Sequence, residues 1–117
     1  TMAKAGSMLG SCGVIVIDDS WSAVKAIKRI THFYAHESCG QCTPCREGVR
    51  WMEDVFHRIV DGHGKTGDLD LLLNVADNIN GKTLCALGDA AAGPVISFVK
   101  KFRHEFEELI KSGANHA

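Results

Sequence analysis

The segment Glu37-Ser-Cys-Gly-Gln-Cys-Thr-Pro-Cys-Arg-Glu-Gly48 places three cysteines at steps of three residues, and a fourth cysteine, Cys85, lies far downstream. A tight C-x2-C-x2-C loop can wrap one corner of a cubane iron–sulfur cluster, and the remaining iron then takes a thiolate from elsewhere in the fold. Iron in such clusters is soft enough to prefer sulfur ligands. Cys39, Cys42, Cys45 and Cys85 are therefore the predicted ligands of a [4Fe–4S] cluster.

A structural zinc ion is the alternative occupant of the same four cysteines, because four thiolates also suit tetrahedral zinc. Zinc ligands usually come as two separated pairs, such as C-x2-C and C-x2-C, whereas this chain has a group of three and one remote cysteine. A redox-active C-x-x-C pair is disfavoured by the third close cysteine and by the absence of a βαβ pattern. The spacing favours the cluster and leaves a zinc-stabilised interaction module as the competing hypothesis.

Four stretches of the chain carry apolar residues at spacings of three and four, and each predicts an amphipathic helix. Helices are expected over residues 20–36, from about residue 46 to residue 60, over residues 68–79, and from Pro94 to just before Gly113. Proline is favoured in the first turn of a helix, which is why the fourth helix is expected to begin there. The predicted fold is mainly α, a small four-helix bundle in which both cysteine segments lie at helix starts and can meet at one end.

The run Val14–Ile17 is apolar and β-branched, which indicates one short buried strand or an extended arm packed on the helices. A single strand cannot form a sheet by itself, so residues 1–19 are expected to be the tail of a preceding subdomain. Residues 20–117 are then the helical [4Fe–4S]-binding domain. Cys12, in the glycine-rich opening, is expected to be a small buried filler.

The composition is that of an ordinary globular domain: 117 residues, 45% hydrophobic, 23% charged, and a net charge of −1. This charge balance predicts no nucleic-acid partner. No run of apolar residues is long enough for a transmembrane helix, so no direct membrane insertion is expected. The odd number of cysteines and their close spacing favour a reducing compartment with metal-bound or free thiols.

The cysteine segment, followed after a helical stretch by Thr83-Leu-Cys-Ala-Leu-Gly-Asp-Ala-Ala-Ala-Gly-Pro94, resembles the C-terminal region of the NADH-binding flavoprotein subunit of respiratory complex I. The opening Ala5-Gly-Ser-Met-Leu-Gly10, with the later Val-Ile-Val-Ile-Asp, also fits the segment that precedes this region in the family. The resemblance covers nearly the whole chain. It implies that Cys39, Cys42, Cys45 and Cys85 match the family's four ligands of a [4Fe–4S] cluster.

The resemblance also implies a role in electron transfer, in which the cluster takes electrons from flavin and passes them to the next iron–sulfur centre. The expected partners are an upstream flavin and NADH domain and the neighbouring iron–sulfur subunits of complex I. FMN and NAD are expected only in that upstream domain. The expected location is the cytoplasmic inner face of the membrane, held there through the complex, or the matrix side of a mitochondrial membrane.

The chain itself contains no G-x-G-x-x-G motif in a βαβ unit, so it is not expected to oxidise NADH unaided, and no catalytic residue is predicted. It is expected to be a domain of a longer protein or one piece of a split protein. Similar modules occur in NAD-reducing hydrogenases and NAD-dependent formate dehydrogenases, and the cysteine motif does not separate these from complex I.

Overall fold

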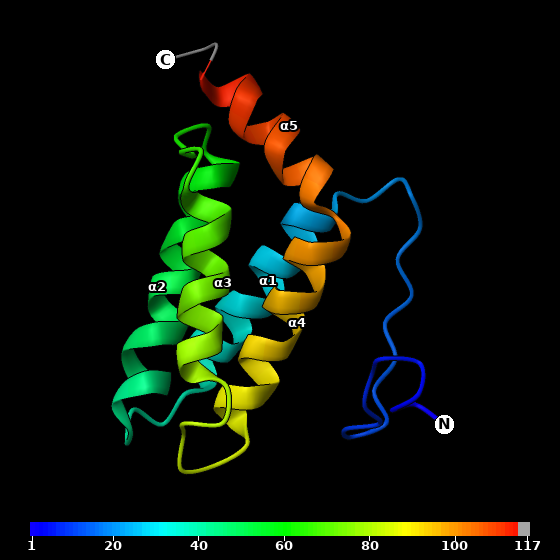
Figure 1. Cartoon of the computed structure of the whole chain (residues 1–117), viewed down its shortest axis with the longest axis vertical. Coiled ribbons are helices and arrows are strands. Elements are labelled where there is room, and N and C mark those ends of the chain that lie inside the picture. Colours follow the sequence, from blue (N-terminus) through cyan, green and yellow to red (C-terminus); the bar gives the residue numbers. More distant parts are fainter. Residues whose placement is uncertain (115–117) are drawn as a thin grey trace.

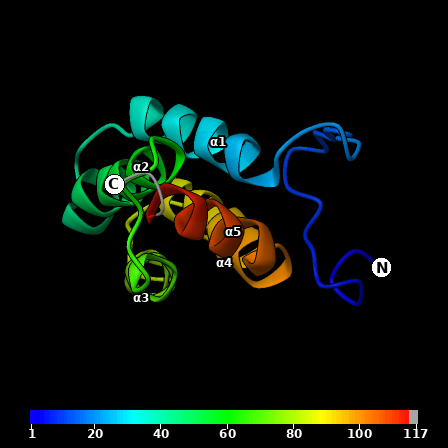
Figure 2. The ribbon, with the colours of Figure 1, turned by 90° about the horizontal axis from the view of Figure 1, so that it is seen from above.

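The computed structural model describes residues 1–114, and within them the chain forms five helices and no strand. The helices are α1 (Ala23–Glu37), α2 (Thr43–Val60), α3 (Asp68–Ile79), α4 (Leu87–Lys101) and α5 (Arg103–Ala114). Helices α1 to α4 form the bundle, with α1 and α3 on opposite sides and α2 and α4 between them (Figure 2). Helix α5 lies across one end of this bundle (Figure 1). The predicted mainly α fold is confirmed.

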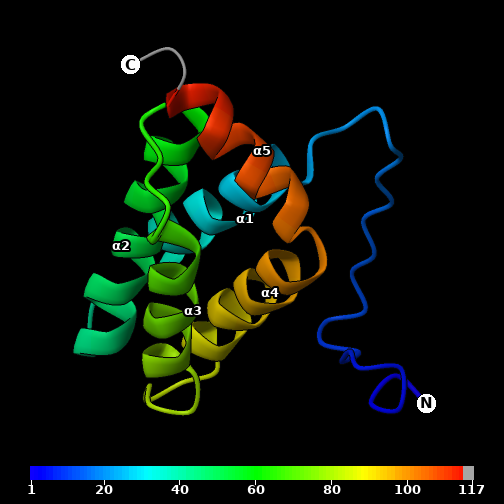
Figure 3. The same ribbon diagram turned by 45° about the horizontal axis from the view of Figure 1, so that its top comes forward.

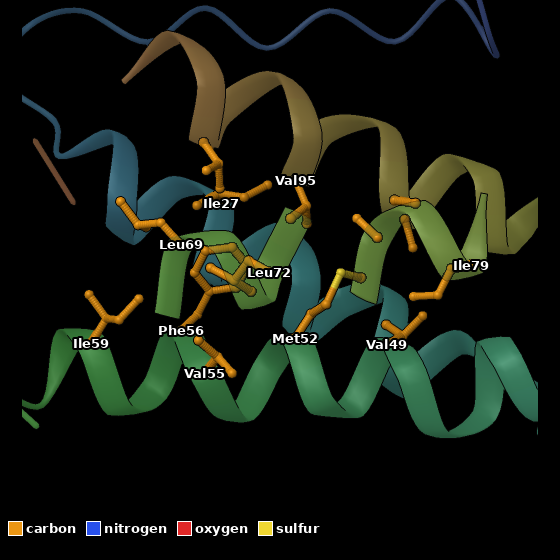
Figure 4. Close-up of a cluster of buried hydrophobic side chains, with 14 of the residues drawn as sticks. Ile27, Val49, Met52, Val55, Phe56, Ile59, Leu69, Leu72, Ile79 and Val95 are labelled. Carbon is orange, nitrogen blue, oxygen red and sulfur yellow. The ribbon is translucent and has the colours of Figure 1, made fainter. Parts of the chain in front are cut away.

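The bundle is built around side chains at the spacings of three and four that the sequence showed. Phe56 and Met52 of α2 are fully buried, and the ring of Phe56 lies 6.0 Å from that of Phe106 on α5. Figure 4 shows that the buried side chains of the first four helices converge on one core. The labelled members of this core are Ile27, Val49, Met52, Val55, Phe56, Ile59, Leu69, Leu72, Ile79 and Val95. Burial of these apolar groups is the main contribution to the stability of the bundle.

The fourth predicted helix differs from the structure in two ways. Helix α4 begins at Leu87, so Pro94 lies inside it instead of in its first turn. The helix also ends at Lys101, because its C-cap Phe102 has a φ of −113° and a ψ of 26°, outside the helical range, and α5 begins at the next residue. The described residues therefore contain five helices instead of the predicted four, because the last predicted helix is divided into α4 and α5. Pro94 removes one hydrogen bond of the helix. The small, buried residues Gly88, Ala91 and Ala92 still allow α4 to pack closely against the other helices.

The segment before α1 contains no strand and runs as an extended arm beside the bundle (Figures 1 and 3). The side chains of Val14, Ile15 and Val16 are 84%, 78% and 90% exposed, so the expectation of a buried strand is wrong for this chain. An extended arm is observed, but residues 14–16 stay exposed instead of packing on the helices as expected. Cys12 is also exposed, with a φ of 66°, which contradicts its expected role as a buried filler.

Two features of the bundle bear on where the cysteines lie. Helices α2 and α3 approach closely at Gly48, where a Cβ atom would stand 2.8 Å from Cδ1 of Ile79. Ile79 is the last residue of α3, so this contact fixes the start of the loop that leads to Cys85. Among residues 1–114, no helix is both long enough and apolar enough to cross a membrane.

Candidate metal centre

The first three cysteines lie where α1 passes into α2, at the end of the bundle opposite α5 (Figure 1). Cys39 is exposed in the connecting loop, and Cys42 is the half-buried N-cap residue of α2. Cys45 lies within the first turn of α2 and is only 6% exposed, at the edge of the core. The helix was expected to begin near residue 46, but it already includes Cys45. The three cysteines thus range from exposed to buried over residues 39–45.

Arg46 holds this loop in place. Its guanidinium donates hydrogen bonds to the carbonyl oxygens of Gly40 at 2.9 Å and Gln41 at 3.4 Å, and to the Thr43 hydroxyl at 3.2 Å. Gly40 has a φ of +80°, a conformation that side chains with a Cβ atom rarely adopt. The left-handed glycine turns the chain between Cys39 and Cys42, and Arg46 ties that turn to α2.

Ser38 makes the only side-chain hydrogen bond to a cysteine sulfur found within residues 1–114, with its Oγ 3.1 Å from Sγ of Cys45. The backbone N–H of Gly40 donates to the same hydroxyl oxygen at 3.4 Å. A metal-bound Cys45 is a thiolate and has no proton, so Ser38 must then be the donor of this bond. The spacing of the cysteines does not predict the Ser38–Cys45 contact, because the contact depends on how the loop folds back over α2.

The fourth cysteine, Cys85, is exposed in the loop between α3 and α4. The loop is closed by the Asp89 carboxylate, which accepts a hydrogen bond from the Gly81 N–H at 2.6 Å. Thr83 donates from its hydroxyl to the Cys85 carbonyl at 2.7 Å. A Cβ atom on Gly88 would overlap the Thr83 methyl carbon, so glycine is what allows this close packing. Asp89 and Thr83 thus define the path of the backbone at Cys85, although the sequence did not single them out.

Both cysteine segments lie at the same end of the bundle, as the sequence predicted (Figures 1 and 3). Helix α3 runs from the far end back to Ile79, which packs against Gly48 one turn beyond Cys45, and the Cys85 loop follows. Within residues 1–114, no three cysteine sulfur atoms all lie within 4.8 Å of one another. The structure therefore brings the four predicted ligands to one end of the molecule without drawing them into a tight group.

The electrostatic setting of this end favours an anion. The N-cap residues of α2 and α4, Cys42 and Ala86, make no side-chain capping hydrogen bond, in contrast to Ser22 of α1. The first backbone N–H groups of α2 and α4 thus have no side-chain acceptor at the cap, and both helix dipoles present their positive ends here. The guanidinium of Arg46 adds a cation, which Glu47 partly compensates through an ion pair at 3.2 Å. A cubane held by four thiolates is an anionic group that these features would stabilise.

The donor set fits an iron–sulfur cluster. All five cysteines are free thiols, and four of them stand at one end of the bundle in the two loops just described. Soft sulfur ligands and accessible amide donors are what such a cluster requires of a protein. His36, which lies near this loop, pairs with Glu37 at 3.3 Å and is exposed.

Comparisons with known proteins place this chain among iron–sulfur binding regions. The family described as the NADH-ubiquinone oxidoreductase-F iron-sulfur binding region matches residues 25–109. The F subunit of the NADH-quinone oxidoreductase of Rickettsia massiliae (strain Mtu5) is 53% identical over 112 residues, which cover 96% of this chain and 27% of that protein. The equivalent protein of Streptomyces coelicolor is 54% identical over 109 residues, covering 93% of this chain and 24% of that protein.

The solved structures include a similar fold in an NAD+-reducing [NiFe]-hydrogenase in its H2-reduced state. It superposes with a TM-score of 0.77 at 32% identity, covering 81% of this chain and 17% of that chain. The present chain spans about a quarter of the length of the curated relatives it matches. Because the family matches well over half of its residues, the chain belongs to the NADH-ubiquinone oxidoreductase-F iron-sulfur binding region family.

Proposed function

We propose that this chain transfers electrons one at a time through a [4Fe–4S] cluster held by Cys39, Cys42, Cys45 and Cys85. The observation that carries the proposal is that the two cysteine loops lie at the same end of the bundle, beside the uncapped starts of α2 and α4. When bound, such a cluster supplies reversible one-electron exchange, at a potential set by its ligands and surroundings. No general acid, base or nucleophile is needed for this function.

The residues around the cysteines have distinct parts in the proposal. Arg46 fixes the backbone of the three-cysteine loop, and Thr83 and Asp89 fix the backbone around Cys85. The helix N-termini offer N–H donors to an anionic group. With Cys45 bound to the cluster as a thiolate, Ser38 donates the hydrogen bond between the two side chains, which is a direct means of adjusting the reduction potential. The chain thus ligates, orients and electrostatically stabilises the electron carrier.

The proposed setting is the NADH dehydrogenase module of an NADH-quinone oxidoreductase. Support comes from the relatives named as the F component of that enzyme, which extend well beyond the part that this chain matches. In this proposal a domain outside residues 20–117 holds FMN and NAD, and residues 1–19 are the tail of that part of the protein. The partners are the neighbouring iron–sulfur subunits, at the inner face of a bacterial membrane or on the matrix side of a mitochondrial one.

The same module of an NAD-reducing hydrogenase is a second candidate, because the hydrogenase structure shares the fold at 32% identity. A zinc-stabilised interaction domain is the third. Zinc–sulfur bonds of about 2.3 Å place tetrahedral sulfur ligands about 3.8 Å apart. No three cysteine sulfurs among residues 1–114 lie within 4.8 Å of one another, so the described arrangement is wider than such a tetrahedron. The sequence spacing of three close cysteines and one remote cysteine, instead of two separated pairs, is what favours the cluster over zinc.

Metal analysis tests the proposal directly. Protein purified without oxygen is expected to hold about four irons and four sulfides per chain, with a broad brown absorption band that dithionite bleaches. The measurement is iron, sulfide and zinc content with an absorption spectrum, before and after anaerobic reconstitution. One zinc per chain and no sulfide, persisting after reconstitution, would favour the zinc-stabilised module.

Replacing Ser38 with alanine is expected to leave the iron content unchanged and make the reduction potential more negative. In wild type, the hydrogen bond from Ser38 stabilises the reduced cluster, which is more negative, more than the oxidised cluster. A difference of about 1 kcal/mol between the two states corresponds to roughly 40 mV for one electron. The measurement is a redox titration followed by absorption. Ser112→Ala, at the opposite end of the molecule, is the matched control and should leave the potential unchanged. An equal potential in Ser38→Ala and wild type would contradict the role of Ser38.

A further inference from the structure

A second group of ligand-type side chains lies on the outer face where α1 packs against α2, and it includes no cysteine. His32 of α1 and Glu53 and His57 of α2 each bring one ligand atom to within 4.8 Å of the other two. It is the one group of three possible ligands with this spacing among residues 1–114. Glu53 and His57 stand four residues apart and so share a face of α2. The packing of α1 on α2 supplies the third member.

The carboxylate of Glu53 is the centre of this group. Its Oε1 atom is hydrogen-bonded to Nδ1 of His32 and lies 3.6 Å from Nε2 of His57. The Glu53 side chain is 17% exposed, whereas those of His32 and His57 are 56% and 46% exposed. A largely covered carboxylate therefore faces two imidazoles that remain open to solvent, so an ion can reach the group from outside.

Neighbouring cations do not take the place of the imidazoles. Lys25, Lys28 and Arg29 line the same surface hollow as His32 and His57. Within the described residues, however, the only ion-pair partners of Glu53 are the two histidines. The carboxylate is thus directed toward groups that can share a metal ion with it, and not toward ammonium or guanidinium groups.

We propose that His32, Glu53 and His57 bind one Zn²⁺ ion, with water completing the coordination. Imidazole nitrogen and carboxylate oxygen bind zinc at about 2.0–2.2 Å, which places tetrahedral ligand atoms about 3.4 Å apart. The distance of 3.6 Å between Glu53 Oε1 and His57 Nε2 is close to this value. Two histidines and one glutamate with an open position form a ligand set that zinc accepts.

The charges nearby decide which ions the site accepts. The three basic side chains in the hollow oppose the approach of any cation, so only an ion that the two imidazoles and the carboxylate bind strongly should occupy the site. Imidazole ligands favour zinc and its transition-metal neighbours over Mg²⁺ and Ca²⁺. An ion here would join α1 to α2 outside the core and stabilise the folded chain through linkage. The site uses none of the four cysteines, so its test does not depend on the electron-transfer proposal.

Equilibrium dialysis against Zn²⁺ tests the proposal, using protein first reconstituted with iron and sulfide. Four proteins are compared at about pH 7.5, where free imidazoles are mostly neutral: wild type, His32→Gln, His57→Gln, and His104→Gln as the control. His104 is an exposed histidine on α5, outside the group. Wild type and His104→Gln are expected to bind one more zinc per chain than the two site variants. The affinity of this zinc should fall at least about 10-fold in each site variant, because losing a ligand should cost no less than losing an outer-shell partner.

Several results would overturn the proposal. Superimposable zinc curves for all four proteins, or an equal loss in His104→Gln, would show that the group is not the binding site. Equal uptake of Mg²⁺ would show a nonspecific charge effect. Circular dichroism checks that each variant is folded, and Glu53→Gln provides a third site variant if one of the histidine variants is not. Iron and sulfide assays on the same samples report separately on the cysteine site.

Discussion

Replacing Cys85 with alanine is expected to reduce the iron bound after anaerobic reconstitution from about four per chain to about three or fewer. The three remaining predicted ligands come from a single loop, and no other cysteine lies in the Cys85 loop. The iron that faces away from the first loop then has no protein thiolate. The measurement is iron and sulfide content, together with the absorption spectrum of the reconstituted protein.

Cys85 is well suited to this test because its side chain is exposed and it is the one predicted ligand outside the first loop. Cys45 is 6% exposed, so a change there would also disturb packing at the edge of the core. An exposed substitution should change the stability of the metal-free chain by no more than about 0.5 kcal/mol. Wild type is expected to gain stability on reconstitution, because metal binding is coupled to the folding of its ligand loops. Cys85→Ala should lose most of that gain in Tm.

Cys12→Ala is the matched control, since Cys12 is also an exposed, free thiol but lies on the arm outside the bundle. It should retain full iron and sulfide content and the full gain in Tm. A full complement of iron and sulfide in Cys85→Ala would refute the assignment of Cys85. Loss of iron in Cys12→Ala instead would point to Cys12 as the fourth ligand.

The helices were predictable because the residues that pack into the core are apolar and recur every three or four positions, which is the spacing of one helix face. The predicted helix over residues 68–79 matches α3, where Leu69, Leu72, Ala76 and Ile79 are buried. The break at Phe102 was not predictable in this way. Phe98, Phe102 and Phe106 keep the helical spacing across it, so the pattern indicates one helix although the backbone turns between α4 and α5.

The placement of the two cysteine segments at one end of the bundle was predictable, and the detail of the candidate site was less so. The spacing of Cys39, Cys42 and Cys45 is a local property that the sequence shows directly. The contact of Ser38 with Cys45 and the closure of the Cys85 loop by Asp89 depend on backbone conformation, which periodicity does not encode. The strand expected at residues 14–17 rested on composition alone, and no strand partner exists for it within residues 1–114.

The other large effect is expected at a charged pair that joins the end of α2 to the start of α3. Arg58 forms two hydrogen bonds to the Asp68 carboxylate, one of them from Nε to Oδ2 at 3.1 Å. The N–H of Lys65 donates to the same carboxylate at 2.8 Å. Asp68 is 3% exposed, and Arg58 is about one third exposed. Burial by itself raises the pKa of Asp68, but the bonds from Arg58 and Lys65 outweigh burial and hold that pKa below its usual value.

Asp68→Asn is expected to destabilise the chain by about 2–3 kcal/mol at neutral pH, toward the low end for breaking a buried pair because Arg58 keeps some contact with water. Asparagine has nearly the same shape and can still accept the Lys65 N–H bond, but it loses the charge and places an NH2 donor where one carboxylate oxygen accepted from Arg58. Asp70→Asn is the matched control on the same helix. Asp70 pairs with Arg103 at 3.2 Å but is 76% exposed, so its loss should cost no more than about 1 kcal/mol.

The pH dependence gives the Asp68 prediction a second, independent readout. A carboxyl group whose pKa is lower in the folded than in the unfolded chain stabilises the fold above the unfolded pKa and loses that effect as the pH falls through the folded pKa. The stability difference between wild type and Asp68→Asn should therefore be constant at neutral pH. It should begin to shrink as the pH approaches 3.8, the usual value for aspartate, and continue to shrink below it. Urea unfolding of reduced, chelator-treated protein at several pH values measures this difference without interference from an acid-labile metal site. A difference that stays constant well below that pH, or one that is equally large in Asp70→Asn, would contradict the role given to the Arg58–Asp68 pair.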